Sequence, residues 1–342
     1  MKRSSVWLGL IGVLLMGFCL SQPAAAGMLL KVPCDQPPGE PNYKNWKVFE
    51  QVVESLSQGE IQVEVHPSAA LGTTESATEA GKMGLFKVWQ GDEGIVGAYA
   101  PFMVWMIPYV FTDEMVMYKW FQSDHFKKVN EQMAKEIGIR ILAGAPYGNY
   151  CFFNKQREIK KLEDLKGLKF RIMPNSQIMG KTYEGLGLSP TPVAWTELYT
   201  GMKTGVIDGL SHALFVFPQQ KLYEVGKYLT LDFSFAGANT VMVNEKWWNA
   251  QPENYKAIFQ EAANLGTLVE MGASTYDNRV TAIGELEKSG VKVSVLDPKE
   301  KMRIKEAAQK AAIAYIEQEV GKQAVQDMLS AVAEIEKKLG ME

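Results

Sequence analysis

The amino-acid sequence predicts an α/β protein built from two lobes. An apolar segment at 28–32, a segment with helical spacing of apolar residues at 44–57 and an alternating apolar–polar segment at 61–65 follow one another. Strands that alternate with helices are typical of a parallel sheet with helical crossovers. The chain has 342 residues, more than the roughly 250–300 at which one hydrophobic core stops growing. Because no low-complexity linker divides it, we expect strands to cross between the lobes more than once.

The alternation continues through the middle of the chain, and the C-terminal part is mainly helical. Thr73 and Thr74 can cap a helix that carries Glu75 and Glu79 early, where the helix dipole favours acids. Further strands are predicted at 139–142, 168–172, 191–194, 206–210 and 291–295. Further helices are predicted at 114–136, 176–185, 196–203, 245–290 and 298–339. We assign these elements to three regions: lobe I mainly at 27–150, lobe II mainly at 151–240, and bridging helices at 241–342, which both lobes share and part of which returns to lobe I.

Residues 1–26 have the layout of a secretory signal peptide. Lys2 and Arg3 give a basic start, an apolar run covers 6–20, and small residues precede the expected cleavage after Ala26. The run is shorter than the ~20 residues that a bilayer-spanning helix needs, which disfavours a membrane anchor. The sequence therefore predicts an exported protein.

Charge and cysteine content exclude several classes of protein. The chain carries 36 Lys and Arg against 39 Asp and Glu, a formal net charge of −3, and has no basic block, so we expect no nucleic-acid partner. Only Cys34 and Cys151 lie beyond the predicted signal peptide, which excludes a disulfide-rich scaffold. These two residues could form one disulfide in an oxidising compartment or remain free thiols.

The sequence contains no recognisable catalytic constellation. Its three histidines, at 66, 125 and 212, stand alone without ligands at metal-binding spacing. A nucleophile elbow and a glycine-rich phosphate loop are also missing from the sequence. Paired carboxylates such as Asp92 and Glu93 are too common on protein surfaces to indicate a site. We therefore expect a protein that is not an enzyme and that uses no metal or cofactor.

The segment 164–209 carries the most informative motifs. Its motif residues are Asp164-Leu165-Lys166-Gly167, Arg171, Gly187 to Pro192, Trp195, Glu197, Tyr199, Thr204-Gly205 and Asp208-Gly209. In their order and spacing they resemble the solute-binding proteins of tripartite ATP-independent periplasmic (TRAP) transporters, the DctP family. The segments 57–65, 71–72 and 108–111 resemble the same family, so the resemblance spans nearly the whole chain after the signal peptide.

The resemblance implies a periplasmic-binding-protein-like fold, with two α/β lobes, crossing strands, a ligand cleft between them and long C-terminal helices that bridge the lobes. It also implies a monomer in the periplasm that captures a small organic acid by hinge closure and delivers it to the membrane permease subunits. Two alternatives remain open. One is a periplasmic module that presents its ligand to a sensor kinase, and the other is a periplasmic enzyme on a related scaffold.

Arg171 is the main candidate for ligand binding. It lies on an apolar strand, where a charged side chain is costly without a partner. A guanidinium offers a planar fork that fits a carboxylate with two hydrogen bonds, and in the family the matching Arg clamps the ligand carboxylate. A salt bridge to an internal Asp or Glu is the alternative. Trp195 and His212 match positions where relatives contact the ligand, although core packing and an ordinary hydrogen-bonded histidine remain alternatives.

One departure from the family pattern bears on the ligand. Many relatives carry a second cationic residue where this chain has Cys151, next to Tyr150. We therefore expect a monocarboxylate with an apolar or aromatic body in preference to a dicarboxylate or a sialic-acid-like ligand, and Cys151 and Tyr150 are themselves candidates for ligand contact. The segment 89–93 matches a pocket loop of relatives, in which Gln90 and Asp92 are candidates. The last candidate for ligand binding is Asp35, which follows the first predicted strand.

Overall fold

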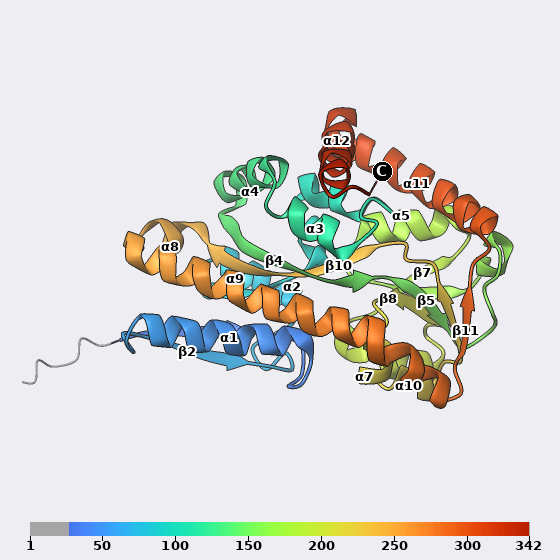
Figure 1. The fold of residues 1–342 in the computed structure, drawn as a ribbon, viewed down its shortest axis with the longest axis horizontal. Coiled ribbons are helices and arrows are strands. Elements are labelled where there is room, and N and C mark those ends of the chain that lie inside the picture. The colour runs from blue at the N-terminus through green and yellow to red at the C-terminus, as the bar shows by residue number, and fades with distance from the viewer. Residues whose placement is uncertain (1–26, 342) are drawn as a thin grey trace, which may run out of the picture.

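The computed structural model describes residues 27–341 and has two α/β lobes, side by side in an elongated molecule (Figure 1). The fold class predicted from the sequence is therefore confirmed. The predicted signal peptide, residues 1–26, lies outside the described residues. Among residues 27–341, none of the helices combines the length and apolar character that crossing a bilayer would require.

Lobe I begins with a parallel pair of strands. β1 (Met28–Pro33) pairs with β2 (Ile61–His66), and α1 (Pro41–Leu56) connects them. The apolar residues at alternate positions of β1 and β2 are buried against α1, as the period-2 pattern predicts. The next helix, α2 (Thr74–Lys82), is capped by the hydroxyl of Thr73, which accepts a hydrogen bond from the Ser76 N–H, and this predicted cap is confirmed.

A three-stranded antiparallel sheet forms the rest of lobe I. β10 (Ala236–Asn244) lies between β3 (Val88–Gly91) and β4 (Ile139–Asn149). All nine residues of β10 are buried, so the strand shows no alternation of apolar and polar residues. The helices that accompany this sheet are η1 (Glu93–Gly97), η2 (Ala100–Met106), α3 (Glu114–Trp120), α4 (Asp124–Ile137) and α8 (Glu245–Asn249).

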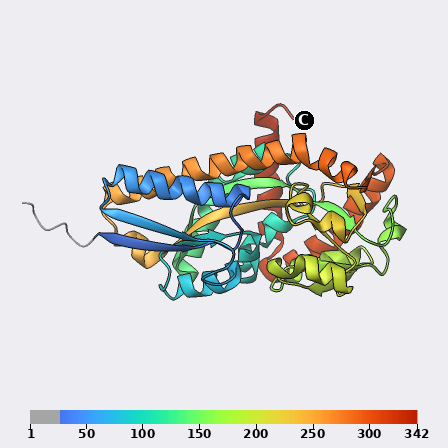
Figure 2. The ribbon, with the colours of Figure 1, turned by 90° about the horizontal axis from the view of Figure 1, so that it is seen from below.

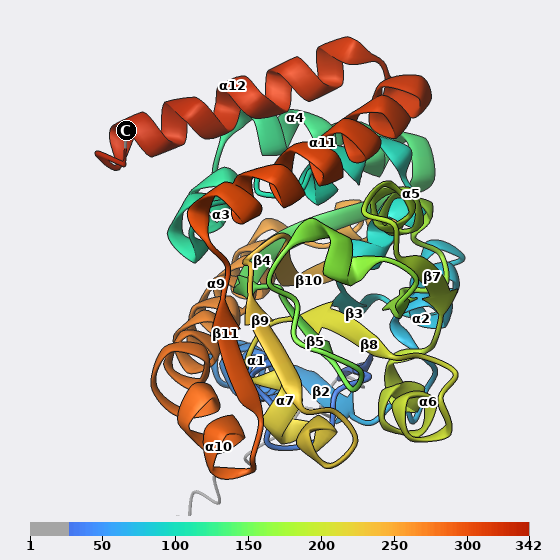
Figure 3. The ribbon, with the colours of Figure 1, turned by 90° about the vertical axis from the view of Figure 1, so that its right-hand side faces the viewer.

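Lobe II is built on one six-stranded sheet, seen from its end of the molecule in Figure 3. In spatial order the strands are β11 (Lys292–Val295), β9 (Tyr228–Leu231), β5 (Cys151–Asn154), β8 (Gly209–His212), β6 (Lys169–Ile172) and β7 (Ser189–Pro192). The accompanying helices are η3 (Leu162–Leu165), α5 (Gln177–Gly185), η4 (Trp195–Glu197), α6 (Leu198–Thr204), α7 (Val216–Gln219) and η5 (Leu222–Glu224).

Three segments of the chain cross between the lobes. β4 passes into β5 with only Tyr150 between them, and β9 returns to β10 through residues 232–235. These two crossings are tied together, because the Tyr150 N–H donates to the Phe235 carbonyl (2.7 Å) and the Ser234 N–H donates to the Tyr150 carbonyl (3.0 Å). The third crossing is α9 (Glu253–Tyr276), which runs beside both lobes in Figure 2 and continues through the π-helical turn η6 (Asp277–Thr281) into α10 (Ala282–Lys288).

The last two helices contact both lobes. α11 (Pro298–Val320) packs on α5 of lobe II, and α12 (Lys322–Lys338) packs on α3 of lobe I. Several predicted boundaries were wrong. The helices expected at 245–290 and 298–339 are each divided, the first after Asn249 and the second at Gly321. The helix expected at 114–136 is divided, because Ser123 caps α4 by accepting a hydrogen bond from the Phe126 N–H. The strand expected at 139–142 continues to residue 149, since it forms the first crossing.

Candidate ligand-binding site

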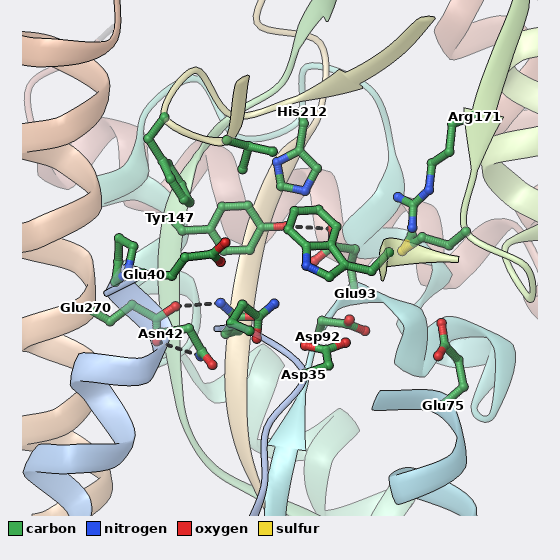
Figure 4. Close-up of a pocket in the computed structure, with 17 residues that line it drawn as sticks. Asp35, Glu40, Asn42, Glu75, Asp92, Glu93, Tyr147, Arg171, His212 and Glu270 are labelled. Atoms are coloured by element: carbon green, nitrogen blue, oxygen red, sulfur yellow. Dashed lines mark hydrogen bonds between the residues drawn. The ribbon is translucent and has the colours of Figure 1, made fainter. Parts of the chain in front are cut away.

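A narrow cavity of about 40 Å³ lies where the two lobes meet (Figure 4). Lobe I and α9 contribute acids and amides, namely Asp35, Gln36, Glu40, Asn42, Glu75, Asp92, Glu93, Asn239 and Glu270. Lobe II and its junction contribute one cation and mostly aromatic or apolar groups, namely Tyr147, Arg171, Met173, Trp195, His212, Phe215 and Val216. The site therefore has two chemically different walls.

Arg171 extends from β6 and is only 5% exposed. Its Nε donates to the Val193 carbonyl (3.0 Å), and within residues 27–341 its guanidinium has no other hydrogen bond and no carboxylate within 4 Å. Burial lowers the pKa of Arg171, whereas Glu93 and Asp92 raise it. The internal salt bridge considered from the sequence is therefore not formed. The Asp208 carboxylate fixes the start of β6 by accepting the Lys169 N–H (3.0 Å), so this motif residue positions the strand that carries Arg171.

His212 ends β8 and lies within a stack of aromatic rings. Its ring is 4.6 Å from the Tyr150 ring, 5.5 Å from the Tyr147 ring and 5.0 Å from the Trp195 ring, between centroids. Nδ1 of His212 accepts the Ala213 N–H (2.9 Å), which leaves the proton of the neutral ring on Nε2. Burial, aided by Arg171, holds the pKa of His212 well below its usual value. His212 is therefore a neutral hydrogen-bond donor in the cavity wall.

Glu93 is held by two tyrosines and is 2% exposed. The Tyr147 hydroxyl donates to Glu93 Oε1 (2.8 Å), the Tyr150 hydroxyl contacts the same oxygen, and the two hydroxyls are 2.7 Å apart. Glu93 Oε2 is buried, and no hydrogen bond from the described residues reaches it. Burial raises the pKa of Glu93. Tyr150 supports Glu93 from behind and is not among the residues that line the cavity.

Asp35 and Asp92 line the cavity, as expected from the sequence. Asp35 accepts hydrogen bonds from Thr74 Oγ1 (2.7 Å) and Gln90 Nε2 (3.0 Å), so Gln90 positions Asp35 and does not itself line the cavity. Asp92 caps η1, because its Oδ1 accepts the Gly94 N–H (2.7 Å). Burial raises the pKa of Asp35, and burial together with Glu93 raises the pKa of Asp92.

Two further acids come from helices. Glu270 of α9 accepts hydrogen bonds from three amide groups, those of Asn42 (3.1 Å), Asn45 (2.8 Å) and Asn239 (2.5 Å). Glu40, just before α1, accepts from Gln220 Nε2 (2.7 Å), a residue of lobe II. Burial raises the pKa of Glu270 to about 7 and that of Glu40 to about 8.

Both cysteines are free and buried. Cys151 lies in a hydrophobic cluster of lobe II behind the cavity, and Cys34 lies in a separate cluster of lobe I. The Cys34 thiol donates to Asn42 Oδ1 (3.4 Å). Cys151 was a candidate for ligand contact, but it is not among the lining residues, because β5 turns its side chain into the core.

The structure thus brings together five of the residues singled out in the sequence, namely Arg171, Trp195, His212, Asp35 and Asp92. The sequence analysis did not predict four further residues that line the cavity, because no local motif surrounds them; they are Glu40, Tyr147, Asn239 and Glu270. Glu93 was set aside as part of a common acidic pair. Its position next to Asp92, at the end of the segment 89–93 that matches a pocket loop of relatives, was the available signal.

Two crossing strands and an interlobe cleft define a two-lobed solute-binding protein, and comparisons with known proteins give its family. Residues 35–318 match the family described as bacterial extracellular solute-binding protein, family 7 (DctP). This chain belongs to that family, which confirms the TRAP resemblance found in the sequence.

Three relatives illustrate the range of similarity. The sialic acid-binding periplasmic protein SiaP of Vibrio cholerae is 29% identical over 239 residues, covering 69% of this chain and 74% of that protein. The ectoine/5-hydroxyectoine-binding periplasmic protein UehA of Ruegeria pomeroyi is 28% identical over 281 residues, covering 79% of both. The crystal structure of the sugar acid-binding protein DctPAm of Advenella mimigardefordensis with galactonate has a TM-score of 0.84 at 25% identity, covering 90% of this chain and 99% of that chain.

Proposed function

We propose that this chain is the periplasmic receptor of a TRAP transporter for a small organic monocarboxylate, with Arg171 as the group that clamps the carboxylate. The observation that carries the proposal is a buried guanidinium that points into the cavity and has no carboxylate partner within residues 27–341. An unpaired buried charge is costly, so a ligand that supplies the missing anion is bound strongly. The relatives named for sialic acid, ectoine and galactonate support a small carboxylate as the ligand class.

The ligand is expected to carry one carboxylate. Arg171 is the only Lys or Arg among the lining residues that the structure describes, and the opposite wall is acidic. A second carboxylate would therefore face Asp and Glu side chains without a cation to pair with. Trp195 and Phe215, which line the same cavity as Arg171, offer apolar surface for the body of the ligand.

Capture is expected to proceed by hinge closure around the crossing segments. The lining residues come from both lobes, so a ligand can contact both walls only when the lobes are together. The Glu40–Gln220 hydrogen bond joins the lobes at the edge of the cavity and would break on opening. Closure removes water from Arg171 and strengthens its ion pair with the carboxylate, and the permease then receives the solute.

The test is to measure ligand binding in variants of Arg171. A thermal-shift screen with monocarboxylates and with succinate and malate identifies a ligand, because binding to the native state raises the melting temperature. Arg171→Ala should weaken the strongest hit by ~2–5 kcal/mol in calorimetry, and Arg171→Lys should recover only part of the loss. Arg140→Ala is the matched control, since Arg140 pairs with Glu245 (2.6 Å) away from the cavity.

Unchanged affinity in Arg171→Ala would remove Arg171 from the site. If only succinate and malate raised the melting temperature, the expectation that the ligand carries one carboxylate would be contradicted.

A further inference from the structure

The two walls of the cavity carry opposite charge. The acidic wall, as we name it, consists of Asp35, Glu40, Glu75, Asp92, Glu93 and Glu270. On the lobe II side, Arg171 lines the cavity together with Trp195, His212 and Phe215, and no other Lys or Arg of the described residues lines it. One guanidinium cannot balance six carboxyl groups, so a ligand with only a negative charge would leave the acidic wall without a counter-charge.

We infer that the ligand is a compact zwitterion, whose carboxylate pairs with Arg171 and whose positively charged nitrogen contacts the acidic wall at Glu93 and Asp92. The nitrogen can be a protonated amine, an amidinium or a quaternary ammonium. The inference rests on the proposed function, because it takes the Arg171 end of the cavity as the place of the carboxylate.

Hydrogen bonding within the protein decides which acids are available to a ligand. The carboxylate of Glu270 is occupied by three amide donors, and both oxygens of Asp35 are occupied by Thr74 and Gln90. Glu93 differs, because its Oε2 is buried and unpartnered among the described residues. Asp92 uses only Oδ1, in the cap of η1. By the same criterion Glu40, which uses only Oε1, and Glu75, which accepts no hydrogen bond from the described residues, are also available to a ligand. Of these four acids only Asp92 and Glu93 are adjacent in the chain, so they can accept hydrogen bonds from one positive group of a ligand.

A cation satisfies this wall better than a hydroxyl group or a metal ion does. Burying a carboxylate without a paired charge is costly, and a hydroxyl supplies a hydrogen bond but no charge. Within the described part of the chain, no three His, Cys, Asp or Glu side chains are grouped so as to hold a metal ion. Aromatic rings, of which Trp195 and Tyr147 also line the cavity, attract organic cations and favour such a group further.

Proton release provides an independent signature. Burial raises the pKa values of Asp35, Glu40, Asp92, Glu93 and Glu270, so part of the wall is protonated near neutral pH. The other titratable or charged groups around the site are Glu75, Arg171, Tyr147, Tyr150 and His212, and the pKa of His212 is well below neutral pH. A bound cation favours the ionised carboxyls, so its affinity should rise between pH 6 and 8. A ligand with only a carboxylate should bind more weakly as the wall ionises.

The experiment uses pairs of ligands that differ in one charge. The mature protein is dialysed against an extract of small metabolites to which two matched pairs and one further acid are added. The first pair is glycine betaine and 3,3-dimethylbutyrate, and the second pair is 4-aminobutyrate and pentanoate; in each pair the second compound keeps the carboxylate and lacks the positive charge. The further acid is gluconate, which has no positive charge. Mass spectrometry then identifies what the protein retains, and calorimetry at pH 6 and pH 8 measures each retained compound. We expect a zwitterion to be retained at least tenfold over a carboxylate of the same shape, with release of protons.

Variants locate the cation. Glu93→Gln keeps the shape of the side chain and an acceptor for the tyrosines. It should weaken binding of the zwitterion at least tenfold while changing binding of the isosteric carboxylate, which lacks the positive charge, less than threefold. Asp92→Asn serves as a second variant should Glu93→Gln fail to fold. Glu131→Gln, on the exposed face of α4, removes the same charge away from the cavity and should have no effect.

Each outcome separates this inference from the proposed function. Retention of an acid without a positive charge, gluconate included, would overturn the inference that the ligand is a zwitterion. If that acid no longer bound to Arg171→Ala, the proposed function would still stand. Failure to retain any carboxylate would contradict the proposed function itself.

Discussion

Glu40 should make the stability of the ligand-free protein fall as the pH rises. Burial raises its pKa from 4.5 to about 8, and only 6% of the residue is exposed. The folded state therefore holds a proton that the unfolded state has released, and this contribution to stability is lost as the pH rises through the folded-state pKa. With about 1.4 kcal/mol for each tenfold difference in proton affinity, Glu40 alone removes about 2 kcal/mol between pH 6.5 and pH 8.5.

Urea denaturation at several pH values in this window measures the summed effect of the buried acids, because burial also raises the pKa values of Glu93, Glu270 and Asp232 to about 7. The difference between the unmodified protein and Glu40→Gln isolates the part that belongs to Glu40. The buried histidine adds little there, because its pKa is lowered and its protonation in the unfolded chain occurs mainly below pH 6.5. Glu40→Gln keeps the acceptor for Gln220 and should reduce the fall in the free energy of unfolding by about 2 kcal/mol. Glu131→Gln should not change it. A stability that stays level from pH 6.5 to 8.5, or an unaltered slope in Glu40→Gln, would refute the reasoning.

Two further predictions concern groups next to the cavity. His212 should remain neutral at and above pH 6.5, with its proton on Nε2, because it is buried beside Arg171 and its Nδ1 accepts the Ala213 N–H. A nitrogen-detected NMR titration with a midpoint near 6.5 would contradict this. Cys34 and Cys151 should both react with a thiol reagent in unfolded, unreduced protein. In the native state they should react only slowly, since burial raises the pKa values of both thiols. If the unfolded protein had no reactive thiols, a disulfide between the two residues would be indicated instead.

Local patterns predicted those elements in which one face is buried and the other is exposed. β1, α1 and β2 have this character, and the predicted boundaries differ from the observed ones by a few residues. β10 could not be predicted in this way, because it is buried on both faces as the centre of a sheet and its residues do not alternate. The position of the crossing of β4 into β5 was missed for a related reason, since residues 144–153 are, apart from Asn149, a continuous run of buried residues without alternation.

The candidate site divides in the same way. Arg171 was found because a family motif surrounds it and because a charge on an apolar strand needs a partner. Glu40 and Glu270 were not found, because the sequence shows only ordinary helix-associated acids at these positions. Their role depends on α1 and α9 packing side by side, a contact between distant parts of the chain. The amide groups that hold Glu270 likewise come from two separate elements, α1 and β10.

The distribution of charge between the lobes links ligand chemistry to closure. In the proposed open state, the acidic wall and Arg171 would each be hydrated. In the structure both are buried, and burial raises the pKa values of the acids because their ionised forms are costly. A ligand with charges of both signs relieves this cost at both walls, whereas a simple anion relieves it only at Arg171. Selection for a zwitterion would therefore act on the closed state, which is the state in which binding energy can drive the hinge.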